Sequence, residues 1–116
     1  MTPSRPHRTV HFHEKHYLDT TTGTKTVTVR WNENVELGPA LFVFGNHPDL
    51  RTLTGRVTFI ETHPIAQLTS TAARQPTGTD MNVFAEQLRA NYYPTMPETA
   101  LVQVVGIVVD TNSARI

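Results

Sequence analysis

Five short stretches rich in valine, threonine and phenylalanine dominate the sequence and limit the folds that it can adopt. Side chains of these types suit the pleated, half-buried surface of a β-sheet. Glycine, proline and asparagine, which favour turns, separate the stretches. The spacing predicts a compact, mostly antiparallel sheet or barrel. The five predicted strands are residues 9–13, 25–31, 40–44, 56–62 and 101–109.

Helices are predicted in two places between these strands. Residues 13–21 form a short candidate helix. The stronger candidate follows Asp80, a suitable N-cap, where apolar residues recur at helical spacing until a proline ends the run. Phe84 and Leu88 are expected to face the core of the protein. One further turn is predicted at residues 64–68.

The length and charge of the chain favour one domain without a strong affinity for nucleic acid backbones. At 116 residues the chain is about one domain long, and we expect residues 9–110 to form it. Residues 1–8 and 111–116 are expected to be flexible tails. Because 10 lysines and arginines balance 10 aspartates and glutamates, strong binding to DNA is not expected.

Cysteine is absent, which excludes disulfides, thiolate zinc sites and a cysteine nucleophile. A chain of this kind is compatible with the reducing cytoplasm, where we expect it to act. The apolar stretch at residues 101–109 is far shorter than the roughly 20 residues of a membrane helix, so no membrane contact is expected. His11, His13 and His16 have only Glu14 as a nearby acid, and we therefore expect no metal and no other cofactor.

The strand predicted at residues 25–31 carries the most chemistry. Its alternation places Val27, Val29 and Trp31 on a core face, and Thr26, Thr28 and Arg30 on the opposite face. The second face presents two hydroxyls and a guanidinium to a ligand. In a regular strand, Lys25 would project to the same side as Val27, away from this row. It joins the row only if the chain bends, which Gly23 would make easy. The alternative is an ordinary half-exposed strand with solvated charged ends.

The block from Gly23 to Arg30, G-T-K-T-V-T-V-R, resembles the G-x-K-T-x-T-x-R signature of ASCH domains, particularly small bacterial enzymes that hydrolyse N4-acetylcytidine. Residues 10–12, 55–59, 87–94 and 101–109 resemble further pieces of that family in the same order. The resemblance implies an α+β, PUA-like β-barrel of about five to six mostly antiparallel strands with two to three short helices.

The resemblance also implies catalytic roles. The family uses a lysine as base, a threonine as nucleophile and a glutamate as acid, and the first two correspond to Lys25 and Thr28. The family glutamate lies in the loop before the long helix, but residues 72–80 contain no glutamate here. Asp80 is the only acid in that loop and therefore the candidate third residue. Its alternative role is the helix N-cap.

Four further residues are candidates for ligand binding. Thr26 and Arg30 extend the polar face of the strand, and Arg30 is suited to anchor a carbonyl group. Arg56 is a candidate wall of a groove, and Tyr93 is free to stack on a nucleobase. Trp31 and Tyr92, in contrast, fit the core by their spacing.

Three functions remain open at this level. The first is an amidohydrolase acting on an acylated cytidine or a similar modified nucleoside. The second is a non-catalytic module that binds RNA or a modified nucleobase, which the missing glutamate favours. The third is a ribonuclease. A modified nucleoside or RNA is thus the expected partner, and the sequence leaves the oligomeric state open.

Overall fold

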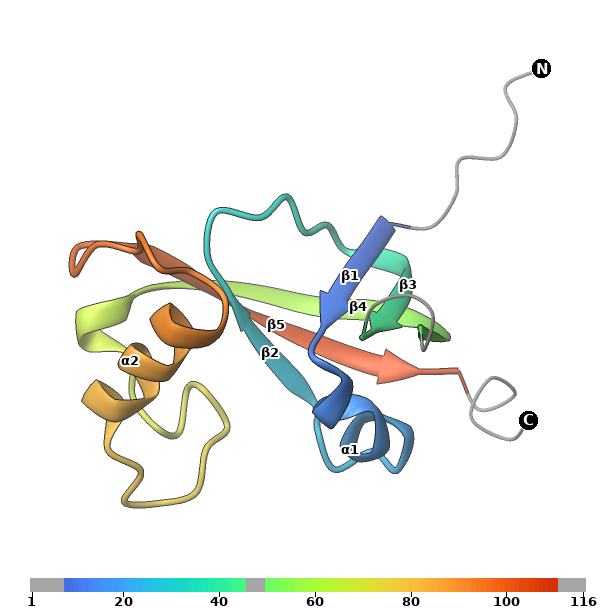
Figure 1. The fold of residues 1–116 in the computed structure, drawn as a ribbon, viewed down its shortest axis with the longest axis horizontal. Coiled ribbons are helices and arrows are strands. Elements are labelled where there is room, and N and C mark those ends of the chain that lie inside the picture. Colours follow the sequence, from blue (N-terminus) through green and yellow to red (C-terminus); the bar gives the residue numbers. More distant parts are fainter. Residues whose placement is uncertain (1–7, 46–49, 111–116) are drawn as a thin grey trace.

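A five-stranded mixed sheet forms the body of the protein (Figure 1). The structure is a computed structural model that describes residues 8–45 and 50–110. The sheet order is β1-β3-β4-β5-β2; β1 runs parallel to β3, and the other neighbours are antiparallel. This arrangement confirms the expected α+β class with mostly antiparallel strands. The strands are β1 (Arg8–Phe12), β2 (Val27–Arg30), β3 (Gly38–Phe44), β4 (Arg51–Pro64) and β5 (Leu101–Val109).

Short helices occupy the connections. Between β1 and β2 lie the 3₁₀ helix η1 (Glu14–His16) and the helix α1 (Tyr17–Thr21), and between β4 and β5 lie η2 (Ile65–Gln67) and α2 (Met81–Asn91). The carboxylate of Asp80 accepts hydrogen bonds from the backbone N–H groups of Asn82 and Val83, at 2.9 and 3.3 Å. Asp80 is thus the N-cap of α2. In Figure 1, α1 and α2 flank opposite ends of β2.

The long antiparallel ribbon of β4 and β5 is bent by an irregularity. The pairing register shifts between Val57 and Phe59 of β4, where the opposing residues are Ile107 and Gly106. Gly106 makes room for this bend, because a Cβ atom there would lie 2.3 Å from the ring of Phe59. A bulge increases local twist. The sheet consequently curls into a half-barrel.

The curled sheet buries apolar side chains on both faces, in two separate clusters. We call them the outer and the inner cluster. The residues of β5 alternate between them: Val102 and Val104 belong to the outer cluster, and Val105 and Ile107 belong to the inner cluster. The outer cluster, between the sheet and α2, includes Val27, Val29, Ile65, Leu68, Ala85, Leu88 and Met96. The inner cluster, inside the curl, includes Val10, Phe12, Ala40, Phe42, Phe44, Leu53 and Val57.

The curl also brings the two edge strands of the sheet together. Strands β1 and β2 are at opposite ends of the sheet order. Nevertheless, the guanidinium carbon of Arg30, in β2, lies 4.7 Å from the centre of the Phe12 ring, in β1. A cation over an aromatic face at this distance is attracted by the ring. This contact closes the barrel on the side where β1 and β2 meet.

Several expected boundaries differ from the observed ones. The strand expected at residues 25–31 forms regular pairing only over Val27–Arg30, whereas the strand expected at 56–62 extends over Arg51–Pro64. Arg8 belongs to β1; the remaining residues expected to form tails lie outside the described part. Among the described residues, none of the helices has the length and apolar character needed to cross a membrane.

Replacing Gly55 by alanine should destabilise the protein. The added Cβ would lie 2.1 Å from the carbonyl oxygen of Val108 and 2.7 Å from the Phe42 ring, so β4 and β5 must separate. We expect a loss on the order of 1–3 kcal/mol in the free energy of unfolding. Urea denaturation followed by the fluorescence of Trp31, the single tryptophan, measures it. Thr52→Ala, at an exposed position of the same strand, is the control and should change little. Equal stability of both variants would contradict this account of the bend.

Candidate functional site

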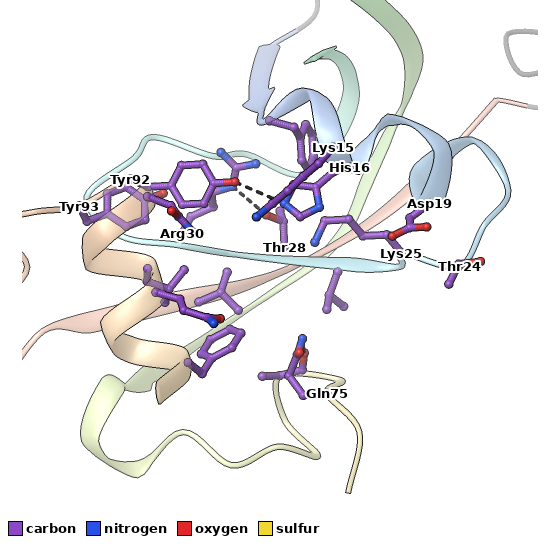
Figure 2. A pocket seen from close by; sticks show the side chains of 18 residues that line it. Lys15, His16, Asp19, Thr24, Lys25, Thr28, Arg30, Gln75, Tyr92 and Tyr93 are labelled. Carbon is purple, nitrogen blue, oxygen red and sulfur yellow. Dashed lines mark hydrogen bonds between the residues drawn. The ribbon is translucent and has the colours of Figure 1, made fainter. Parts of the chain in front are cut away.

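A cavity of about 300 Å³ lies beside β2, one of the two edge strands of the sheet (Figure 2). This volume is at the lower end of the range for small-molecule sites. One wall comes from the end of β1, from η1 and from α1, and the other comes from α2 and the loop before it. The polar residues of the lining are Lys15, His16, Asp19, Thr24, Lys25, Thr28, Arg30, Gln75, Gln87, Asn91, Tyr92 and Tyr93.

Lys25 enters this cavity because the chain bends before β2. Gly23 adopts a φ of +81°, which favours glycine, and the backbone N–H of Lys25 donates to the carbonyl of Asp19 at 2.9 Å. Regular strand alternation begins only at Val27. Figure 2 shows the Lys25 side chain on the same side of β2 as Thr28 and Arg30. The bend that the sequence requires for Lys25 is therefore present.

The electrostatic surroundings of Lys25 disfavour its charged form. Burial, followed by the positive charge of Arg30, lowers the pKa of Lys25 to about 8. The carboxylate of Asp19 acts in the opposite direction. The neutral amine of Lys25, which is able to accept a proton, is consequently more populated near physiological pH than that of an ordinary lysine.

Thr28 and Arg30 are joined on the concave face of β2. Both are buried, with 7% and 6% of their surfaces exposed. The Nε of Arg30 donates a hydrogen bond to the Oγ1 of Thr28 at 2.9 Å. The Thr28 oxygen therefore lies beside a fixed positive charge, which would stabilise negative charge developing on it.

Glu33 anchors the other side of the Arg30 guanidinium. Nη1 of Arg30 lies 3.3 Å from Oε1 of Glu33, and the Tyr93 hydroxyl donates to the same carboxylate. Asn32, with a φ of +57°, lies in a bend of the chain between these partners. Burial, followed by the hydrogen bond to Glu33, raises the pKa of Tyr93.

Sequence reasoning did not identify Glu33 as part of the site. An acid three residues after an arginine is too common in sequences to indicate an ion pair. The signal in the sequence is an arginine at a strand end, followed by an asparagine, which tolerates a left-handed backbone, and then a glutamate.

His16 and Tyr92 join the two walls of the cavity. The Tyr92 hydroxyl and the Nε2 of His16 are hydrogen-bonded at 3.3 Å, which connects the end of α2 to η1 (Figure 2). Burial, followed by the charges of Lys25 and Lys15, lowers the pKa of His16 to about 4, so its imidazole is neutral near pH 7. The expectation that Tyr92 is a core residue is wrong, because 38% of its surface is exposed. It follows the last turn of α2, where the helical face no longer packs on the sheet.

The wall on the α2 side is less charged and presents carboxamides. Gln75, from the loop before α2, and Gln87 and Asn91, from α2, line the cavity with the apolar Phe84 and Leu88. The Nε2 of Gln75 donates to the carbonyl of Ala73 at 3.2 Å. Carboxamides both donate and accept hydrogen bonds, which suits the polar edge of a nucleobase.

The structure brings together four of the seven residues expected at the site: Lys25, Thr28, Arg30 and Tyr93 line the cavity. Thr26 is exposed and outside the lining. Arg56 is exposed on β4, and Asp80 caps α2 without lining the cavity. Within residues 8–45 and 50–110, histidine, aspartate and glutamate side chains do not form a group of three able to hold a metal ion.

Solved structures similar to this one decide the fold. An ASCH domain from Lactobacillus crispatus matches with a TM-score of 0.58 and 12% identity, over 88% of this chain and 79% of that one. The chain has the fold of an ASCH domain. This confirms, at the level of fold, the resemblance seen in the sequence.

Two further structures match this ASCH fold. Protein EF3133 from Enterococcus faecalis, of the family DUF984, has a TM-score of 0.58 and 18% identity over 79% of this chain and 67% of its own. The hypothetical protein PH0355 has a TM-score of 0.63 and 13% identity, over 88% of this chain and 97% of its own. No protein-family model and no curated protein matches the sequence.

Removing the Arg30 side chain should weaken the ASCH fold at its closed side. Arg30→Ala eliminates the contact with Phe12 and leaves Thr28 and Glu33 without their shared donor. We expect a loss of about 1–3 kcal/mol in the free energy of unfolding. Arg56→Ala, at an exposed position on β4, is the matched control and should change stability by less than about 0.5 kcal/mol. The measurement is urea denaturation, and similar losses in both variants would contradict the assigned role of Arg30.

Proposed function

We propose that this chain is an amidohydrolase that removes the acyl group from an N4-acylated cytidine or a similar modified nucleoside. The observation that carries the proposal is the presence of Lys25 and Thr28 in one nucleobase-sized cavity. The pKa of Lys25 is lowered to about 8, and the Thr28 oxygen is held by Arg30. These two residues also occupy the lysine and threonine positions of the G-x-K-T-x-T-x-R signature.

The first chemical step transfers the acyl group to Thr28. The neutral amine of Lys25 takes the hydroxyl proton as the Thr28 oxygen attacks the acyl carbon, and a carbon–oxygen bond forms. The carbon–nitrogen bond then breaks, and the Lys25 ammonium returns its proton to the leaving amine. Water hydrolyses the resulting ester with Lys25 again acting as base, which releases the carboxylic acid and restores Thr28.

Arg30 supports this chemistry in two ways. Its Nε donor at 2.9 Å favours the deprotonated Thr28 oxygen over the hydroxyl. Its charge also contributes to the lowered pKa of Lys25, second to burial. Because Glu33 and Phe12 fix the guanidinium in place, little reorganisation is needed when charge develops.

The proposal differs from the family pattern in the source of the leaving-group proton. Residues 72–80 contain no glutamate, and Asp80 caps α2. Lys25 therefore acts as base and then as acid. Asp19 lines the cavity and favours the ammonium form of Lys25, which assists the second of these roles.

The second candidate function is a module that binds a modified nucleobase or RNA without chemistry. The observation that favours it is Gln75: the loop that carries the family's acid contributes a carboxamide to this cavity. A carboxamide hydrogen-bonds to a base but does not deliver a proton to a leaving group. Saturable binding of cytidine compounds with no turnover would favour this function over the enzyme.

Incubation of the purified protein with N4-acetylcytidine should produce cytidine and acetate. Chromatography of samples taken over time measures this conversion. Lys25→Ala and Thr28→Val should each lower kcat by roughly 10²–10⁴-fold, because base and nucleophile act in the same step. The control Thr62→Val alters an exposed threonine of β4 and should retain full activity. Turnover that survives Lys25→Ala would exclude this mechanism.

The rate should depend on pH through the ionisation of Lys25. Because the neutral amine is the active form and the pKa is lowered to about 8, kcat/KM should rise with pH and level off above about pH 8. Asp19→Asn removes a carboxylate that raises this pKa, so the midpoint should move to lower pH. Initial rates between pH 6 and 9.5 measure both effects. A flat profile, or a midpoint that Asp19→Asn leaves in place, would contradict the role of Lys25.

A further inference from the structure

A second cavity, of about 460 Å³, adjoins the first at the end of β1. The two cavities share four lining residues, Phe12, Arg30, Tyr92 and Tyr93. Side chains that line two cavities lie at the junction between them. A ligand larger than one nucleoside would therefore extend from the first cavity toward the second along these four residues.

The junction offers a site for one negative charge. Arg30 is the charged member of the four shared residues. Its hydrogen bonds to Thr28 and Glu33 use Nε and Nη1, and Nη2 has no partner among the residues that the structure describes. Although only 6% of its surface is exposed, Arg30 lines both cavities, so part of its side chain faces the space where they meet. Guanidinium N–H groups at such a position suit a phosphate oxygen.

Beyond the junction, the second cavity suits an aromatic ring better than a further phosphate. Its carboxylates, from Glu14 and Glu33, outnumber the single arginine, so additional negative charge is disfavoured there. His11 and His13 add imidazole rings to the phenol of Tyr92. Aromatic faces stack on nucleobases of any type, and carboxylates accept hydrogen bonds from exocyclic amino groups.

We infer that the second cavity is a subsite for the neighbouring nucleobase of a single-stranded oligonucleotide whose linking phosphodiester contacts Arg30. The first cavity then holds the modified base, so the inference rests on the proposed function for that cavity. The preferred ligand is a modified residue within a strand, and a free nucleoside fills only half of the site.

Calorimetric titration of the full chain with a series of cytidine compounds tests this inference. The series consists of cytidine, its 3′- and 5′-monophosphates, and dinucleotides that carry cytidine on either the 5′ or the 3′ side. We expect one dinucleotide to bind at least tenfold more tightly than the corresponding monophosphate, because a second base stacks in the second cavity. The two monophosphates separate the contribution of the phosphate from that of the base.

A pair of histidine variants identifies where the gain arises. His11 lines only the second cavity, so His11→Ala should remove most of the dinucleotide gain and leave the affinity for cytidine unchanged. His63→Ala, at a partly exposed position on β4 outside both cavities, is the matched control and should preserve the gain.

The outcomes separate the two proposals. Equal affinities for the dinucleotides and monophosphates, or a gain that His11→Ala does not reduce, would overturn the second subsite while leaving turnover of N4-acetylcytidine intact. Absence of binding for every compound, together with absence of turnover, would overturn the proposed function as well. Dinucleotide binding without turnover would support the subsite and the binding module.

Discussion

The contact between the Arg30 guanidinium and the Phe12 ring is the interaction on which the site depends. It joins the two edge strands of the curled sheet, and these strands are remote in the hydrogen-bonded order. The same guanidinium holds Thr28 and Glu33. A buried cation requires several partners to offset its desolvation. Here the ring, the hydroxyl and the carboxylate provide them, so closure of the sheet and arrangement of the polar groups are achieved by one side chain.

Local patterns predicted much of the fold, because they concern elements that neighbouring residues determine. The last strand and the Asp80 cap were predicted correctly, since both have clear signals in the sequence. The extent of β4 was missed at residues 51–55, where polar residues alternate with Leu53 and the pairing with β3 decides the structure. A barrel was expected, but the place of the bend was not predictable, because it depends on a bulge opposite Gly106 that forms only when β4 and β5 pair.

The candidate site was predictable mainly on the side of β2, and on the opposite wall the sequence indicated Tyr93 and, through the resemblance, the loop before α2. Lys25, Thr28 and Arg30 belong to one short segment whose pattern and resemblance are visible in the sequence. Within that distant loop, only the folded chain shows that Gln75, and not Asp80, lines the cavity. Tyr92 was misjudged because helical spacing continues to it while packing against the sheet does not.

The separation of the core into two clusters has a dynamic consequence. Helix α2 packs on the outer cluster, whereas the inner cluster is built from the strands and contains no residue of α2. Local opening costs less free energy than global unfolding when it disrupts only part of a core. Outward displacement of α2 would break the bond between Tyr92 and His16 and widen the cavity, while the inner barrel kept its packing. Such an opening would be subglobal: β2 would lose the packing of Val27 and Val29 against α2 but keep its pairing with β5, so Thr28 would stay attached to the sheet.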